Sequence, residues 1–209
     1  MKKTNVYVDG FNLYYGALKG TPYKWLDIRK LCELLLPNNH INQIKYFTAM
    51  VSARPHDPDQ PVRQQTYLRA LQTLSNVTVV KGSFLSHPVL LPLARSITDG
   101  RSNSAWVIKT EEKGSDVNLA THLLNDGYKK EYDIAVMITN DSDLLEPMRI
   151  VRNELKLPVG IINPQKHPSW ALRNHASFIK PVRGWALQES QLPNTLTDAD
   201  GTFTKPENW

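Results

Sequence analysis

Aspartates follow two apolar runs of the sequence, at the points where the runs stop. Asp9 comes directly after residues 6–8, and Asp141 and Asp143 come shortly after residues 134–138. If both runs are parallel strands, their carboxyl ends meet at the edge of an α/β sheet where ligands bind. Carboxylates gathered there repel one another unless a cation lies between them, and hard divalent cations prefer such oxygen ligands. The pattern therefore predicts a divalent metal site and chemistry on phosphates.

A fourth aspartate, Asp116, lies in the first turn of a predicted helix, where an acid is favourable to the helix dipole without any function. Capping of the following helix is likewise the alternative for Asp143, although capping explains one acid and not two acids together with Asp9. We predict four catalytic and metal-ligating residues: Asp9, Asp116, Asp141 and Asp143. The supporting polar side chains are predicted to be Asn12, Thr139, Asn140 and Ser142.

Strand-like and helix-like segments alternate along the chain, a pattern typical of a parallel sheet with helices on both faces. We therefore predict a three-layer α/β/α Rossmann-like sandwich whose central sheet is mainly parallel. Residues 83–103 are rich in Pro, Ser and Gly and are predicted to be irregular. The predicted strands are residues 4–8, 44–51, 77–81, 105–109, 134–139 and 158–162, and the predicted helices are residues 27–36, 61–74, 115–125, 144–154 and 170–176.

The charge of the chain is unevenly distributed along its 209 residues. The formal net charge is +5, yet residues 185–209 contain four acids against one lysine, which leaves +8 for residues 1–184. We predict that residues 1–184 form one domain and that residues 185–209 form a surface-tracking or flexible tail. A basic body attracts a polyanion, although a generally basic surface without function is the alternative.

Several features bear on the location of the protein. The apolar runs are shorter than the roughly 18 residues that a membrane span needs. The first residues lead straight into a strand, without the apolar region of a signal peptide. A single cysteine, Cys32, excludes an intramolecular disulfide and a cysteine metal cluster. We therefore expect a cytoplasmic protein without a membrane partner.

Three blocks of the sequence, in this order and spacing, resemble the signature blocks of the NYN domain, a family of the PIN-like nuclease superfamily. They begin at Val6 (VYVDGFNLY), Glu112 (EKGSDVNLA) and Tyr132 (YDIAVMITNDSDL), and the resemblance extends from about Thr4 to Lys180. Residues 187–193 also resemble the ending of the bacterial subgroup related to LabA. The resemblance implies a Rossmann-like α/β/α sandwich with an acidic pocket and a ribonuclease that depends on Mg²⁺ or Mn²⁺.

The resemblance also implies roles for particular residues. Asp9, Asp116, Asp141 and Asp143 match the acidic positions of the family, and Asn12 matches its polar position. Two departures stand out. His122 occupies a position where many relatives carry an acid, and Asn140 and Ser142 replace the glycines of the commoner Gly-Asp-Gly-Asp form.

The leading hypothesis is an endoribonuclease that hydrolyses RNA phosphodiester bonds with a metal-activated water held by the acidic pocket. Single-stranded RNA is the expected partner, and a homodimer is an open prediction. His122 motivates one alternative, a catalytically weak regulatory module that binds RNA or protein. Another alternative is a nuclease that acts on DNA. The predicted nucleic-acid contacts are Lys113, Arg54, Lys81 and Lys109.

Overall fold

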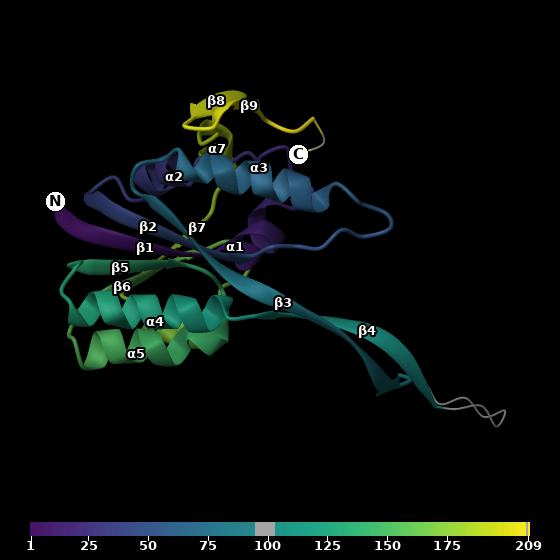
Figure 1. Ribbon diagram of the computed structural model, residues 1–209. Coiled ribbons are helices and arrows are strands. Elements are labelled where there is room, and N and C mark those ends of the chain that lie inside the picture. Colours follow the sequence, from purple (N-terminus) through teal and green to yellow (C-terminus); the bar gives the residue numbers. More distant parts are fainter. Residues whose placement is uncertain (95–102, 208) are drawn as a thin grey trace.

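The computed structural model describes residues 1–94, 103–207 and 209. Within these ranges, seven strands form a central sheet in the order β4-β3-β2-β1-β5-β6-β7 (Figure 1). Neighbouring strands are parallel except β3 and β4, which are antiparallel. The predicted, mainly parallel sheet is therefore confirmed. The strands are β1 (Lys2–Asp9), β2 (Asn39–Ala49), β3 (Val77–Pro92), β4 (Ser104–Lys113), β5 (Ile134–Ile138), β6 (Val159–Asn163) and β7 (Phe178–Pro181).

Helices cover both faces of the sheet, as the predicted α/β/α sandwich requires (Figure 1). Successive side chains of a strand point to opposite faces, and β1 shows the result: Val6 and Val8 belong to one hydrophobic cluster and Tyr7 to the other. The helices α2, α3 and α7 pack on the first face, and α4, α5 and α6 on the second. The helices are α1 (Gly10–Leu13), η1 (Tyr14–Leu18), α2 (Ile28–Leu35), α3 (Gln60–Gln72), α4 (Ser115–Tyr128), η2 (Ser142–Leu144), α5 (Leu145–Asn153), α6 (Trp170–His175) and α7 (Gly184–Glu189).

Helix α4 differs in two respects from its predicted form. The sequence predicts a helix over residues 115–125 that Gly127 ends, but the helix continues to Tyr128 and Gly127 lies buried against Tyr132. The start is not capped by the Ser115 hydroxyl. Gly114 takes the cap position with a φ of 97°, a left-handed conformation that favours glycine. The carboxylate of Glu112 accepts the backbone N–H of Ser115 at 3.0 Å instead.

Strands β3 and β4 continue beyond the sheet as a two-stranded ribbon that projects from the body (Figure 1). The predicted irregular structure is therefore wrong for residues 83–92, and residues 95–102 lie outside the described part of the chain. The prolines that suggested a loop, Pro88 and Pro92, follow the segment of β3 that pairs with β2, which ends at Gly82. One edge of β3 is free there, so a proline removes no sheet hydrogen bond on that side.

Residues after Arg183 form α7 and a small hairpin, β8 (Thr195–Asp198) with β9 (Gly201–Thr204), against the α2–α3 face. Arg69 of α3 binds Asp198 through two hydrogen bonds of 2.7 and 2.6 Å. The Trp209 ring lies 5.5 Å from that of Tyr67. The division of the chain at residue 184 remains a prediction. Among the described residues, no helix is both long and apolar enough to cross a membrane.

Candidate metal centre

Three carboxylates converge at the carboxyl edge of the sheet. One oxygen each of Asp9, Asp116 and Asp141 lies within 4.8 Å of the others. Asp9 ends β1, Asp141 follows β5, and β1 and β5 are neighbours in the sheet, as expected from their apolar runs. Asp116 comes from the first turn of α4. The acidic hollow around them is lined by Asp9, Phe11, Asn12, Tyr15, Glu112, Ser115, Asp116, Asp141 and Gln165.

Asp9 is the most buried of the three, with 5% of its surface exposed. Its two oxygens accept hydrogen bonds from the Asn12 backbone N–H at 2.9 Å and from the Thr139 hydroxyl at 3.0 Å. Burial nevertheless raises the pKa of Asp9 to about 6, because these hydrogen bonds only partly offset it and the charges of Asp116 and Asp141 add to it. A cation between the three carboxylates would relieve that penalty.

Gly10 lets the chain turn sharply after Asp9. A Cβ at this position would lie 2.7 Å from the Phe47 carbonyl oxygen and 2.7 Å from the Tyr46 ring. Any other residue would push the start of α1 away from β2. The glycine therefore holds Asp9 and the Asn12 N–H that binds it at the sheet edge.

The predicted supporting residues connect the strand ends to one another. The Thr139 hydroxyl donates to Asp9 and accepts the backbone N–H of Asp141 at 3.1 Å, so it couples two of the three acids. The Asn12 side-chain oxygen accepts the Asn140 backbone N–H at 3.0 Å. The Asn140 amide in turn holds the loop after β6, since its oxygen accepts the Ser169 N–H at 2.6 Å. The distances between the strand ends that carry Asp9 and Asp141 are thus determined by these hydrogen bonds as well as by the sheet.

Asp116 is half-buried, and its pKa is raised, chiefly by burial and then by the charges of Asp141, Glu112 and Asp143. Glu112 was not among the predicted site residues, although its carboxylate lines the acidic hollow. It lies four residues before Asp116, and its role as the cap of α4 brings it there. The sequence signal for it was its place at the start of the second resembling block.

Asp143 lies apart from the three convergent acids. It is exposed, and its backbone N–H donates to the Asp141 carboxylate at 2.9 Å, which makes Asp141 the cap of the short helix η2. Ser142 is also exposed on this helix. A role of Asp143 as a metal ligand remains a prediction. Its charge contributes to the raised pKa of Asp116.

His122 faces the interior of the sandwich. Its ring lies 5.6 Å from the Phe47 ring, and its Nδ1 lies 3.3 Å from the Lys45 ammonium. Burial and the Lys45 charge lower the pKa of His122, which favours the neutral imidazole. The residue that differs from the family pattern therefore contacts a cation and a ring, and it does not belong to the lining of the acidic hollow.

The predicted RNA-contacting cations lie on exposed parts of the molecule. Lys109 and Lys113 both pair with Glu111, at 2.5 and 3.1 Å. Side chains alternate along β4, so these three residues share the face of the ribbon opposite to Glu112. Lys81 is exposed on β3, and Arg54 is exposed in the loop between β2 and α3. Their contact with nucleic acid remains a prediction.

The donor set fits a hard divalent cation. Three carboxylates offer anionic oxygens at mutual distances that a single ion can span, and partial burial excludes part of the competing solvent. Asp9, Asp116 and Asp141 would hold it, and Mg²⁺ and Mn²⁺ both prefer such ligands.

An α/β/α sandwich that gathers carboxylates at the ends of adjacent parallel strands is consistent with the PIN-like class of nuclease folds. Comparison with protein families gives the particular family: the model of the NYN domain matches residues 3–183. The chain belongs to the NYN domain family, which confirms the resemblance of its three sequence blocks.

Individual proteins that are similar to this chain include the following two. One is 6-hydroxy-3-succinoylpyridine 3-monooxygenase HspA of Pseudomonas putida, 30% identical over 237 residues that cover 99% of this chain and 75% of that protein. The other is a crystal structure of a protein of unknown function from Vibrio parahaemolyticus, with a TM-score of 0.56 and 15% identity. The match covers 88% of this chain and 94% of the Vibrio chain. At this identity it supports the fold alone.

Proposed function

We propose that this protein is a metal-dependent endoribonuclease that hydrolyses phosphodiester bonds in single-stranded RNA. The convergence of Asp9, Asp116 and Asp141 within 4.8 Å at the β1–β5 edge carries the proposal. Membership of a PIN-like nuclease family supports the reaction class. The Mg²⁺ or Mn²⁺ dependence follows from the all-carboxylate donor set.

The residues of the hollow have distinct tasks in this proposal. Asp9, Asp116 and Asp141 hold the cation, which when bound would act as a Lewis acid and lower the pKa of a water. Thr139 and the Asn12 N–H keep the Asp9 oxygens oriented toward the other acids. Asn140 supports the loop that carries Gln165, a residue of the hollow's rim, through a hydrogen bond of 3.0 Å. Such preorganisation is where a nuclease site derives most of its effect.

The substrate is proposed from charge. The net charge of +8 in residues 1–184 favours a polyanion. Single-stranded RNA is the proposed form because its unstacked bases are open to contact with a protein. The exposed cations Lys113, Arg54, Lys81 and Lys109 are the proposed phosphate contacts. We further propose that the protein acts in the cytoplasm.

The test compares cleavage of a labelled single-stranded RNA by the wild type, by Asp141→Asn and by Glu146→Gln. Glu146 is an exposed acid of α5 that pairs with Arg149 at 3.3 Å, away from the hollow. We expect Mn²⁺-dependent cleavage by the wild type and by Glu146→Gln, and its loss in Asp141→Asn and in EDTA. Equal cleavage by all three proteins would remove this site from consideration.

Two alternatives use the same hollow. A regulatory module would bind RNA or protein without turnover under any divalent cation, and His122 was the motive for this reading. Because His122 contacts Lys45 and Phe47, it gives that reading less support than the sequence did. A nuclease for DNA is distinguished from a ribonuclease by measuring the cleavage of RNA and of DNA of the same sequence in parallel.

A second candidate function comes from the Pseudomonas putida relative, whose name denotes monooxygenation of a pyridine. Its 30% identity over 99% of this chain is the observation that favours this candidate. Oxygen uptake with 6-hydroxy-3-succinoylpyridine and a reduced nicotinamide as electron donor would test it. Uptake that persists in Asp141→Asn, together with no RNA cleavage, would favour this candidate over the nuclease.

The ribbon of β3 and β4 supports a homodimer. Trp106 and Ile108 of β4 are 72% and 70% exposed, and Leu90 pairs with Trp106 on the same face. Exposed apolar side chains gathered on one face are typical of a protein–protein contact. Light scattering after size exclusion should give a dimer for the wild type and a monomer for Trp106→Ser/Ile108→Ser. A monomeric wild type would refute the homodimer.

A further inference from the structure

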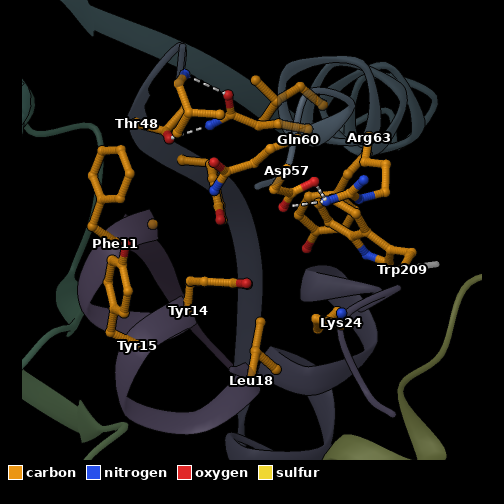
Figure 2. Close-up of a pocket in the computed structure, with 16 residues that line it drawn as sticks. Phe11, Tyr14, Tyr15, Leu18, Lys24, Thr48, Asp57, Gln60, Arg63 and Trp209 are labelled. Carbon is orange, nitrogen blue, oxygen red and sulfur yellow. Dashed lines mark hydrogen bonds and ion pairs between the residues drawn. The ribbon is translucent and has the colours of Figure 1, made fainter. Parts of the chain in front are cut away.

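A second hollow lies beside the acidic one, on the α2–α3 side of the sheet (Figure 2). It is partly open to solvent, and the centres of water-sized molecules could occupy about 90 Å³ of it. Six aromatic side chains contribute to its walls, and we call it the aromatic pocket. These are Phe11, Tyr14, Tyr15, Tyr46, Tyr67 and Trp209. None of the three acids of the metal centre lines it.

The walls are held in place before any ligand arrives. The Tyr67 hydroxyl donates to the Leu26 carbonyl at 3.0 Å, and the Tyr67 ring packs between those of Trp25, Tyr46 and Trp209. Both polar atoms of the Gln64 amide make hydrogen bonds. The nitrogen donates to the Ala49 carbonyl at 2.9 Å, and the oxygen accepts the Val51 N–H at 2.9 Å. A pocket with fixed walls costs little entropy to fill.

The faces of the pocket suit a flat ring. Figure 2 shows Phe11 and Tyr15 on one side, Trp209 on the opposite side and Tyr14 between them. The ring faces of aromatic side chains attract other aromatic rings by stacking or edge contacts. The side chains of Phe11, Tyr14 and Trp209 come from opposite ends of the chain, so only the folded protein builds this arrangement.

Two of the three charged side chains that line the pocket pair with each other, and Lys24 is the third. Arg63 binds both oxygens of Asp57 at 2.6 Å, so the two charges largely cancel. Lys24 lies 5.9 Å from the centre of the Trp209 ring and is held there as a cation–π pair. The indole N–H of Trp209 is buried and has no hydrogen-bond partner in the described part of the chain. An uncharged ring with an acceptor atom matches this set better than an ion.

The aromatic pocket and the metal centre share a wall. Phe11 and Tyr15 line both hollows, and Gly10 of the aromatic pocket directly follows Asp9. Tyr46 is close enough for the Asp9 charge to contribute to its raised pKa, of which burial is the larger cause. A ring bound in the pocket therefore lies next to the three carboxylates.

We propose that the aromatic pocket is a binding site for an uncharged planar heteroaromatic ring, held beside the metal centre with Trp209 as one wall. Such a ring has two sources, the base of a bound nucleic-acid strand or a free heteroaromatic molecule. The site is independent of the proposed nuclease reaction, since the binding needs no divalent cation.

The test measures binding by titration calorimetry in EDTA, with adenosine, uridine and nicotinamide as probes. Trp209→Ala and Tyr14→Ala remove one wall each, and Trp185→Ala is the matched control because Trp185 is 51% exposed on α7 and does not line the pocket. We expect at least one probe to bind the wild type and the control, and to bind each wall variant about tenfold more weakly. Thermal melting identifies a variant that fails to fold. In that case the binding measured with the other wall variant tests the proposal.

The probes separate the two sources of the ring. Binding of the nucleosides in preference to nicotinamide supports a base of a strand, and a uridine hexanucleotide should then bind more tightly than uridine. Binding of nicotinamide at least as tightly as the nucleosides supports a free heteroaromatic molecule. The proposal is overturned if no probe binds the wild type, or if the wall variants bind as the wild type does. Neither result would touch the nuclease proposal, which depends on cleavage with Mn²⁺.

Discussion

The ammonium of Lys45 lies 2.6 Å from the carboxylate of Asp126, and this buried ion pair joins strand β2 to helix α4. The Tyr7 hydroxyl donates to the same carboxylate oxygen at 2.7 Å, so β1 takes part as well. Asp116 is at the other end of α4. The position of an acid of the metal centre therefore depends on polar contacts made three helical turns away.

Removal of one partner of this ion pair should destabilise the protein strongly. Asp126→Ala leaves the buried Lys45 without its counter-charge, and we expect a loss of about 3–5 kcal/mol in the free energy of unfolding. Urea denaturation measures it. The double variant Lys45→Met/Asp126→Leu removes both charges and should recover most of the loss. If the double variant is as unstable as Asp126→Ala, packing and not charge explains the site.

The stability of the protein should depend on pH through Asp9. Its pKa is raised from 3.8 to about 6, so the folded state binds the proton more tightly than the unfolded state. Protonation of Asp9 therefore contributes to the stability of the folded state. The contribution is complete below pH 3.8 and is lost as the pH rises through about 6. At pH 8 in EDTA, the ionised carboxylate should cost about 3 kcal/mol.

Asp9→Asn tests this dependence, because an amide has no charge to bury. We expect it to raise the melting temperature at pH 8 in EDTA and to have little effect at pH 4. Glu146→Gln is the control for a change of net charge, since Glu146 is exposed. An equal effect of Asp9→Asn at both pH values would contradict the prediction.

Divalent cations should stabilise the wild type through the three convergent acids. At about 100 times its dissociation constant, a cation that binds only the folded state adds about 2.7 kcal/mol. Thermal melting with and without Mn²⁺ should show this increase in the wild type and its absence in Asp141→Asn. Asp143→Asn should keep most of it, because Asp143 is exposed and lies outside the group of three. A complete loss in Asp143→Asn would make Asp143 a ligand as well.

Replacement of His122 should have little effect on the metal centre. The imidazole contacts Lys45 and Phe47 rather than the acids, so we expect His122→Gln to change the Mn²⁺ affinity by no more than about twofold, or about 0.4 kcal/mol. Calorimetry with Mn²⁺ measures it. A change of the order of tenfold would restore His122 as the reason for a retuned site.

The local pattern of the sequence was enough to predict most of the elements. Unbroken apolar runs indicated β1 and β5 and placed Asp9 and Asp141 at their ends, because a buried parallel strand is apolar on both faces. Asp27, at the start of the helix predicted over residues 27–36, is a residue type that helix N-caps favour, and its carboxylate accepts the Lys30 N–H at 2.9 Å. Such features depend on neighbours in the sequence, whose geometry is nearly constant.

Local pattern was misleading where distant segments decide the conformation. Pro88 and Pro92 indicated a loop, yet β4 pairs with this segment and makes it a strand. Glu112 was predicted only as part of the second sequence block, and its place at the acidic hollow depends on how α4 packs. In each case the outcome depends on where another segment packs.

The amino-acid sequence alone therefore predicts the family through the resemblance of its three blocks. It predicts the layers of the fold and the proposed type of chemistry through periodicity and residue type. Tertiary structure decided which acids converge, where His122 points and that Phe11 and Trp209 face one pocket. Convergence of residues so far apart in the chain results from the packing of both hydrophobic clusters against the sheet, and no local window contains that information.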